Sequence, residues 1–113
     1  MKYTELIIGF APSLVPLVLN GSKTLTYRLG DKWGFLKIGD IISAKDSEVD
    51  KLFAELEIVN IERVTFGDLS NNSKGHEVYE TDKEKRMVFS KYYTRTIKND
   101  ESVLILEFKV LSK

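Results

Sequence analysis

The sequence contains no cysteine and only one histidine, His76. The absence of cysteine excludes disulfide bonds, thiolate metal sites and cysteine nucleophiles. Zinc sites combine several cysteine, histidine or carboxylate ligands, and a single histidine makes such a site improbable. We therefore expect neither a metal nor a cofactor.

Net charge and long apolar runs are also absent. Seventeen basic residues balance seventeen acidic ones, so no overall electric field draws the protein to nucleic acid or to an anionic membrane, and any contact with nucleic acid must be local. No run approaches the roughly 20 apolar residues of a membrane helix. The N-terminal segment also lacks the apolar core and the cleavage site of a signal peptide. We expect a cytoplasmic protein without membrane association.

The 113 residues, 42% hydrophobic and 30% charged, fit a single domain covering residues 1–113. Apolar runs and alternating patterns predict strands at residues 3–10, 24–29, 41–44, 52–64 and 102–111. Helices are predicted at residues 12–20 and from about residue 82, where Thr81 and Glu84 match a capping box. The last strand is apolar enough to pair centrally. The order of elements predicts an α+β fold, with a mostly antiparallel curled sheet or small β-barrel and two helices at its rim.

Residues 21–28, GSKTLTYR, form the candidate site. Gly21 ends the first helix, and Lys23 stands at the entrance of the strand that follows. Alternation places Thr24, Thr26 and Arg28 on one face, opposite an apolar face of Leu25, Tyr27 and Leu29. The polar row can bind carbonyl, phosphate or base-edge acceptors. An amphipathic strand with a solvated outer face shows the same alternation.

Aromatic and basic residues offer a second set of candidates. Trp33 lies in a loop between glycine turns, where it can stack on a base or close over the core. In the second helix, an apolar side predicted to face the core consists of Met87, Val88, Phe89, Tyr92 and Tyr93. The same region contains six cations: Lys83, Lys85, Arg86, Lys91, Arg95 and Lys98. A basic edge beside aromatic rings suits recognition of single-stranded or flipped bases, although surface lysines also serve solubility alone.

The chain resembles an ASCH domain (activating signal cointegrator homology), a branch of the PUA-like superfamily of small β-barrels linked to RNA. The resemblance rests first on Gly21, Lys23, Thr26 and Arg28, which fall on the family motif; Thr26 replaces the commoner acidic residue. The order of the remaining features also matches: a turn at residues 39–40, a loop with His76, aromatic residues at 92–93 and a final strand with a Glu-Phe pair at 107–108.

The resemblance implies a cleft between barrel and helices that takes RNA or a modified nucleoside. Its floor is the strand of residues 21–28. The candidate ligand-binding residues are Gly21, Thr24, Arg28, Trp33, His76 and Tyr93. His76 can contact a base or titrate near neutral pH, but a lone loop histidine is more often exposed and without function.

One bacterial branch of the family is similar in having a lysine, a threonine three residues later and a downstream glutamate. It is an amidohydrolase that removes the acetyl group of acetylcytidine. Lys23 and Thr26 fall on its first two positions. Glu80, four residues after His76, falls on the third, with Glu77 as the alternative.

Three functions follow from these observations. The first is a binding domain for RNA or a modified nucleoside. The second is an amidohydrolase in which Thr26 attacks, neutral Lys23 accepts the proton and Glu80 serves the leaving amine. The third is a protein-interaction domain without a small ligand, which predicts an exposed apolar patch around Trp33 and a cleft too small for a base.

Overall fold

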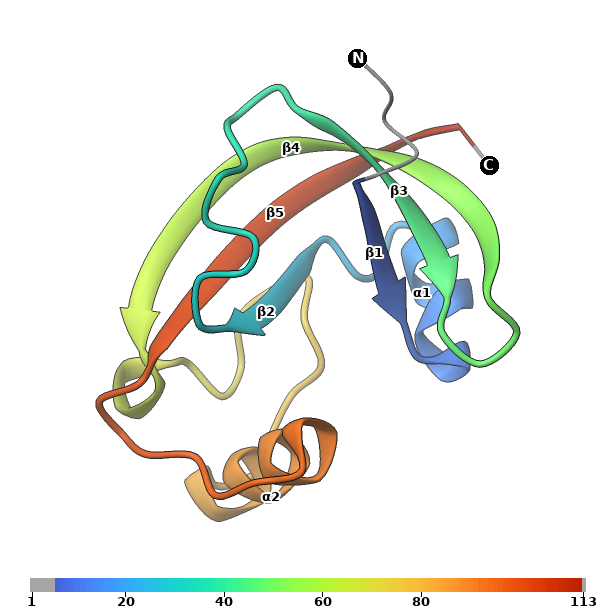
Figure 1. Ribbon diagram of the computed structural model, residues 1–113. Coiled ribbons are helices and arrows are strands. Elements are labelled where there is room, and N and C mark those ends of the chain that lie inside the picture. The colour runs from blue at the N-terminus through green and yellow to red at the C-terminus, as the bar shows by residue number, and fades with distance from the viewer. Residues whose placement is uncertain (1–5, 113) are drawn as a thin grey trace.

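The computed structural model describes residues 6–112, and its main feature is a curled five-stranded sheet (Figure 1). The strands are β1 (Ile7–Phe10), β2 (Leu25–Leu29), β3 (Ile41–Asp46), β4 (Lys51–Thr65) and β5 (Ser102–Ser112). They lie in the order β1-β3-β4-β5-β2; β1 and β3 are parallel and all other pairs are antiparallel. The helices are α1 (Val15–Leu19) and α2 (Asp82–Tyr93), with short 3-10 turns η2 (Pro12–Leu14) and η3 (Phe66–Asp68). The prediction of a small α+β fold with a curled sheet and helices at its rim is confirmed.

The long strands β4 and β5 arch over the rest of the molecule (Figure 1). Their pairing shifts register near residues 55–56 and 58–60. Such irregularities bend a strand and increase its twist, so they allow the sheet to curl. The strand predicted at residues 3–10 is β1 in its described part, and residues 3–5 lie outside the described residues.

β5 pairs with both β4 and β2, as its apolar sequence predicted. Both of its faces are buried because each faces a different core. Leu104, Leu106 and Phe108 belong to a first core inside the curled sheet. Val103 belongs to a second core, which also contains Tyr27 of β2. α2 covers this second core through Phe89.

α2 begins as predicted but does not bury the predicted side. The Thr81 hydroxyl accepts a hydrogen bond from the Glu84 N-H at 3.0 Å, which is the predicted N-cap. Phe89 is buried, whereas Met87 and Tyr92 are 63% and 58% exposed. Lys85 is buried instead, and its ammonium donates to the Leu69 carbonyl. The apolar pattern could not show this, because lysine buries its aliphatic stem when its ammonium finds an acceptor.

β1 and β2 are the edge strands of the sheet, so each has one edge without a neighbouring strand. Within residues 6–112, no helix is long and apolar enough to cross a membrane. The exposed edge of β2 is the feature that positions the candidate site.

Candidate functional site

A cavity lies along the free edge of β2, between this strand, α2 and the loop that precedes α2. The volume open to the centres of water molecules is about 80 Å³, which is room for roughly six waters or one small ring. The cavity is lined by Phe10, Leu14, Lys23, Thr26, Tyr27, Arg28, His76, Glu77, Tyr79, Val88, Phe89, Tyr92 and Tyr93.

Gly75 brings the loop of residues 70–80 against the start of β2. The N-H groups of Thr24 and Leu25 both donate to the Gly75 carbonyl, at 2.8 and 3.1 Å. Gly75 has a φ of +88°, and a Cβ at this position would lie 2.1 Å from the Thr24 hydroxyl oxygen. Only glycine fits this backbone angle and this close approach without strain. The contact places the next two residues, His76 and Glu77, beside the candidate strand.

Lys23 and Glu77 form the polar pair at one end of the cavity. The Lys23 ammonium lies 2.7 Å from a Glu77 carboxylate oxygen, and the two side chains are 3% and 35% exposed. Burial lowers the pKa of Lys23, with a smaller contribution from Arg28, and the neighbouring Glu77 opposes this shift. A lysine with a lowered pKa is easier to deprotonate, which is what a lysine base requires.

Thr26 and Arg28 lie on the same face of β2, as the alternation predicted. Thr26 is buried, and its hydroxyl oxygen accepts a hydrogen bond from Arg28 Nε at 3.0 Å. Arg28 Nη2 donates to the Gly9 carbonyl at 2.9 Å. The guanidinium also lies 5.4 Å from the centre of the Phe10 ring, within cation-π range. Arg28 therefore connects β2 to β1 across the open side of the sheet and fixes the Thr26 side chain.

His76 is held in one orientation. Its ring stacks on the Tyr27 ring with centroids 3.7 Å apart and planes at 7°. Its Nδ1 lies 3.0 Å from the Glu77 carbonyl oxygen. A carbonyl oxygen can only accept, so Nδ1 carries the proton of this bond. Burial, together with the nearby Lys23 charge, lowers the pKa of His76 to about 4, and the ring is therefore neutral at pH 7.

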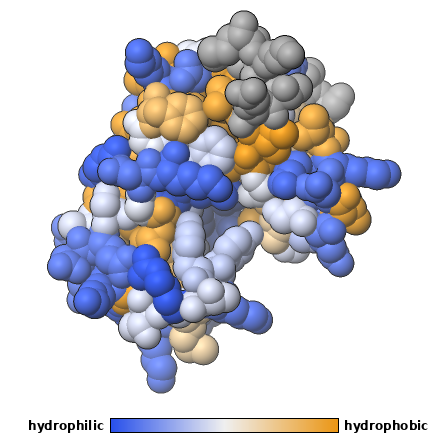
Figure 2. All heavy atoms as spheres, viewed as in Figure 1, coloured by the Kyte–Doolittle hydropathy of each residue, from blue (hydrophilic) through white to orange (hydrophobic). Residues whose placement is uncertain are grey.

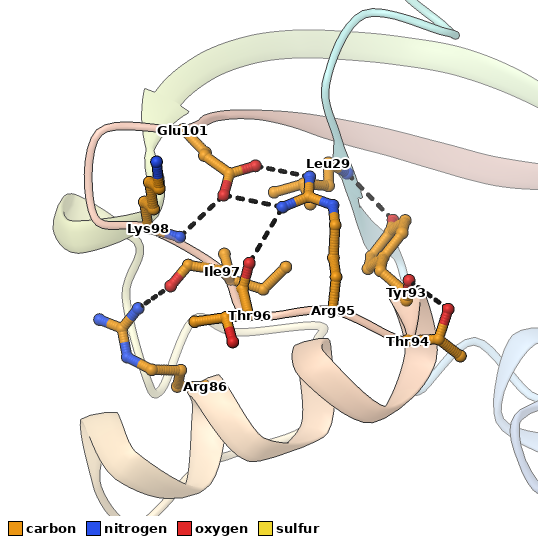
Figure 3. Close-up of polar contacts among 9 residues, drawn as sticks. All are labelled: Leu29, Arg86, Tyr93, Thr94, Arg95, Thr96, Ile97, Lys98 and Glu101. Carbon is orange, nitrogen blue, oxygen red and sulfur yellow. Dashed lines mark hydrogen bonds and ion pairs between the residues drawn. The ribbon is translucent and has the colours of Figure 1, made fainter.

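Aromatic side chains of α2 form the opposite wall. The Tyr93 hydroxyl accepts a hydrogen bond from the Leu29 N-H at 3.0 Å, at the end of β2 (Figure 3). Tyr92 lines the cavity and is also exposed to solvent, so it lies at the mouth. A flat ligand that enters here would meet tyrosine rings on one side and the polar groups of β2 on the other.

Five residues of the predicted site line this cavity: Lys23, Thr26, Arg28, His76 and Tyr93. The alternative glutamate, Glu77, lies there as well, whereas Glu80 is exposed and does not line it. The geometric reason is Tyr79, whose buried ring and N-H bond to the Asn71 carbonyl hold the segment in the second core. The chain has left the cavity by the time it reaches Glu80.

Three other predicted residues lie elsewhere. Gly21 follows α1 and has a φ of +84°, as a helix-ending glycine does, but it does not line the cavity. Thr24 packs against Gly75. Trp33 is buried in the first core, so of the two predictions for this ring, closing over the core is the one the structure supports.

Tyr27 lines the cavity although the sequence pattern placed it on the apolar face. Because the cavity lies at a strand edge, residues from both faces of β2 reach it. No signal in the sequence identifies β2 as an edge strand. Tyr79 was also not predicted as a site residue, and nothing in its sequence context distinguishes it from a core aromatic. Tyr92 was predicted only as one of the aromatic residues beside the basic edge.

The predicted basic edge is smaller than the sequence suggested. Lys85 is buried, and Arg86 donates to the Ile97 carbonyl and to the Asn99 side chain. Arg95 forms a two-bond pair with Glu101 at 2.6 and 2.9 Å (Figure 3). These three cations therefore hold α2 and the segment after it in place. The exposed cations of the set besides Arg95 are Lys83, Lys91 and Lys98. Hydrophilic side chains are spread over the visible face and do not gather at one site (Figure 2).

The described residues, 6–112, contain no group of three histidine or carboxylate side chains that could hold a metal ion. The polar groups of the side chains that line the cavity are an amine, the Thr26 hydroxyl, a guanidinium, an imidazole, one carboxylate and four tyrosine hydroxyls. This set suits hydrogen bonding and proton transfer.

No protein-family model matches the sequence, and no curated protein matches it significantly. Solved structures do resemble the fold. An ASCH domain from Lactobacillus crispatus JV V101 has a TM-score of 0.61 and 19% identity, with 87% of this chain and 70% of that chain covered. A protein from Enterococcus faecalis V583 has a TM-score of 0.71 and 19% identity, covering 88% and 71%. A variant of an ASCH protein from Zymomonas mobilis has a TM-score of 0.63 and 13% identity, covering 91% and 67%.

The chain therefore has the ASCH-domain fold, as the motif of residues 21–28 indicated. The TM-scores of 0.61–0.71 establish a shared fold, and identities of only 13–19% leave activity to be argued from the site.

Proposed function

We propose that the cavity binds the base of a modified nucleoside. The observation that carries this proposal is the pairing of a polar floor with aromatic walls around room for one small ring. The floor offers the Thr26 hydroxyl and the Arg28 guanidinium, and Tyr92 and Tyr93 offer rings for stacking. Protein sites that read an unstacked base combine these two elements.

A single nucleoside fits this site better than an RNA strand. Both cavity cations already have partners, Lys23 in Glu77 and Arg28 in Thr26 and Gly9. Three of the six predicted surface cations act as tethers within the protein. Few cations are left for phosphates, on which affinity for a nucleic-acid strand depends.

Calorimetric titration tests this preference. We expect acetylcytidine to bind wild-type protein, and Arg28→Met to weaken binding by about tenfold through loss of a charge-assisted donor. Lys83→Met, on the exposed face of α2, is the matched control and should bind like wild type. A single-stranded RNA that binds more tightly than the nucleoside at roughly 50 mM salt, and that loses affinity steeply with added salt, would favour the strand instead.

A second candidate, amide hydrolysis, is favoured by the contact between Lys23 and Glu77 beside Thr26. In this reaction the Thr26 oxygen attacks the amide carbonyl and Lys23 takes the hydroxyl proton. The carbon–nitrogen bond then breaks, the leaving amine receives this proton from Lys23, directly or through the Glu77 carboxylate, and water hydrolyses the threonyl ester. The lowered pKa of Lys23 supports its role as the base.

Incubation with acetylcytidine and chromatographic detection of cytidine tests this activity. Thr26→Val keeps the shape of the side chain and removes the nucleophile, so we expect turnover to fall at least about 100-fold. Glu77→Gln should also lose turnover, whereas Glu80→Gln should retain it. A Thr26→Val protein as active as wild type would exclude Thr26 as the nucleophile, and a loss confined to Glu80→Gln would restore the other glutamate.

The protein-interaction hypothesis predicted an exposed patch around Trp33 and no room for a base. Trp33 is buried, and a cavity with a polar floor lies beside Arg28. The cavity argues against this third function, whereas Phe35, whose ring centroid lies 6.0 Å from that of Trp33, is 56% exposed and leaves apolar surface next to it.

A further inference from the structure

The free edge of β2 is occupied at both of its ends. At the start, the Leu25 N-H donates to the Gly75 carbonyl at 3.1 Å. At the end, the Leu29 N-H donates to the Tyr93 hydroxyl at 3.0 Å. Neither N-H therefore points toward β5, which is the one strand paired with β2 among residues 6–112.

In an antiparallel pair, the N-H and C=O of one residue point to the same side of the strand, and successive residues alternate between sides. Thr26 and Arg28 face β5, opposite Leu106 and Leu104. The residue between them, Tyr27, stands opposite Ile105 and has the orientation of Leu25 and Leu29. Its N-H and C=O thus point off the sheet, and no other group among residues 6–112 is bonded to them.

The Tyr27 peptide groups lie on the edge of β2 along which the cavity runs. Tyr27 lines it, together with Thr26 and Arg28 on either side. The residues that occupy the two ends of the edge, Leu25 and Leu29, are about 13 Å apart at strand spacing. An added strand has no room between the Gly75 loop and Tyr93, so only a small molecule can use the exposed groups.

We propose that the N-H and C=O of Tyr27 form a backbone reading edge that binds an amide-like group of the ligand, one with a hydrogen-bond acceptor beside a donor. This inference rests on the proposed function and adds the groups that fix the orientation of the ligand. Unpaired backbone groups in a cavity are costly, and a ligand that supplies both partners regains this energy. A nucleobase edge or an acylated exocyclic amine has this pair of groups.

The reading edge also bears on the second candidate activity. The Tyr27 N-H belongs to the peptide unit that follows Thr26. A carbonyl bound to this N-H would be polarised next to the Thr26 hydroxyl, and the same N-H would stabilise the oxyanion that forms on attack. Backbone donors of this kind need no side chain to be identified in the sequence.

Amide exchange measured by NMR tests the open edge without any ligand. In the free protein we expect the Tyr27 amide to exchange with solvent at least about tenfold faster than the amides of Thr26 and Arg28, which are bonded to β5. Equal protection of the three amides would overturn the inference.

The same spectra with excess acetylcytidine test the ligand contact. We expect the Tyr27 amide resonance to shift and its exchange to slow by about tenfold. If other cavity amides respond and Tyr27 does not, the reading edge is refuted while nucleoside binding stands. If no cavity amide responds, the proposed function fails, and the exchange of the free protein still decides whether the edge is open.

A matched pair of variants isolates the N-H from the ring. Tyr27→Ala loses the ring and keeps the donor, and Tyr27→Pro loses both. Proline is tolerated on an edge strand where its missing N-H faces outward, so Tyr27→Pro should fold if the orientation is as argued. We expect Tyr27→Pro to bind acetylcytidine about tenfold more weakly than Tyr27→Ala. Equal affinities would contradict the proposal.

Discussion

Replacing Gly75 with alanine tests how the candidate site is assembled. The positive φ of this residue strains any side-chain-bearing residue by about 1–2 kcal/mol. The new Cβ would also lie 2.1 Å from the Thr24 hydroxyl, and relief of such crowding costs about 1–3 kcal/mol. We expect Gly75→Ala to lower the free energy of unfolding by about 2–5 kcal/mol. Ligand binding should fall as well, because His76 and Glu77 move away from Lys23.

The matched control is Gly39→Ala, since Gly39 has a φ of +98° but no atom within 4 Å of an added Cβ. Urea unfolding should show only the backbone cost there, about 1–2 kcal/mol. Adding Thr24→Ala to Gly75→Ala removes the crowding and should recover the difference between the two glycine variants. The reasoning is refuted if both glycine substitutions cost the same, or if Thr24→Ala recovers nothing.

Three further predictions concern buried polar groups. The pKa of His76 is about 4 in the folded protein and about 6.5 in the unfolded chain, so the unfolded state binds more protons between these values. The free energy of unfolding should therefore fall as the pH drops through this window, by about 3 kcal/mol at pH 4. Urea unfolding of wild type and His76→Asn at several pH values measures this loss, and parallel pH profiles of the two proteins would contradict it. Glu77→Gln leaves the buried Lys23 ammonium without its partner and should lower the free energy of unfolding by roughly 3 kcal/mol. Lys23→Met should cost less, because it leaves a partly exposed carboxylate that water can hydrate. Equal losses in chemical denaturation would show that the Lys23 ammonium is solvated. Arg86→Met removes the donor to the buried Ile97 carbonyl and should lower the free energy of unfolding by about 1–3 kcal/mol. The control Lys83→Met, at an exposed position, should change the melting temperature little. Similar melting temperatures for the two variants would show that Arg86 does not tether the segment after α2.

The sequence predicted the strands, the capped second helix and the polar face of β2 because each depends on local periodicity. The hydroxyl of Thr81 needs only its own helix start to act as a cap. Thr26 and Arg28 share a face through the two-residue period of any strand. These features do not depend on which elements become neighbours.

The predictions that differ from the structure depend on which elements become neighbours. The spacing from His76 predicts Glu80 at the site, but the docking of Gly75 on β2 places Glu77 beside Lys23, and Glu80 lies outside the cavity. The stripe of α2 was read as buried along its length, yet α2 packs on the sheet mainly through Phe89, and Lys85 takes a core position. Charge counting cannot distinguish a solvated arginine from one that holds a carbonyl, as Arg86 does with Ile97.

The link from Arg28 to Gly9 gives the cavity a wall made of one side chain. Other parts of the boundary are packed rings, such as Phe89 and Tyr27, which cannot change without disturbing the core. A shorter residue at position 28 would extend the cavity toward β1 without moving any strand. A substitution at position 28 alone can therefore broaden or narrow the range of ligands that this cavity admits, without altering the sheet that surrounds it.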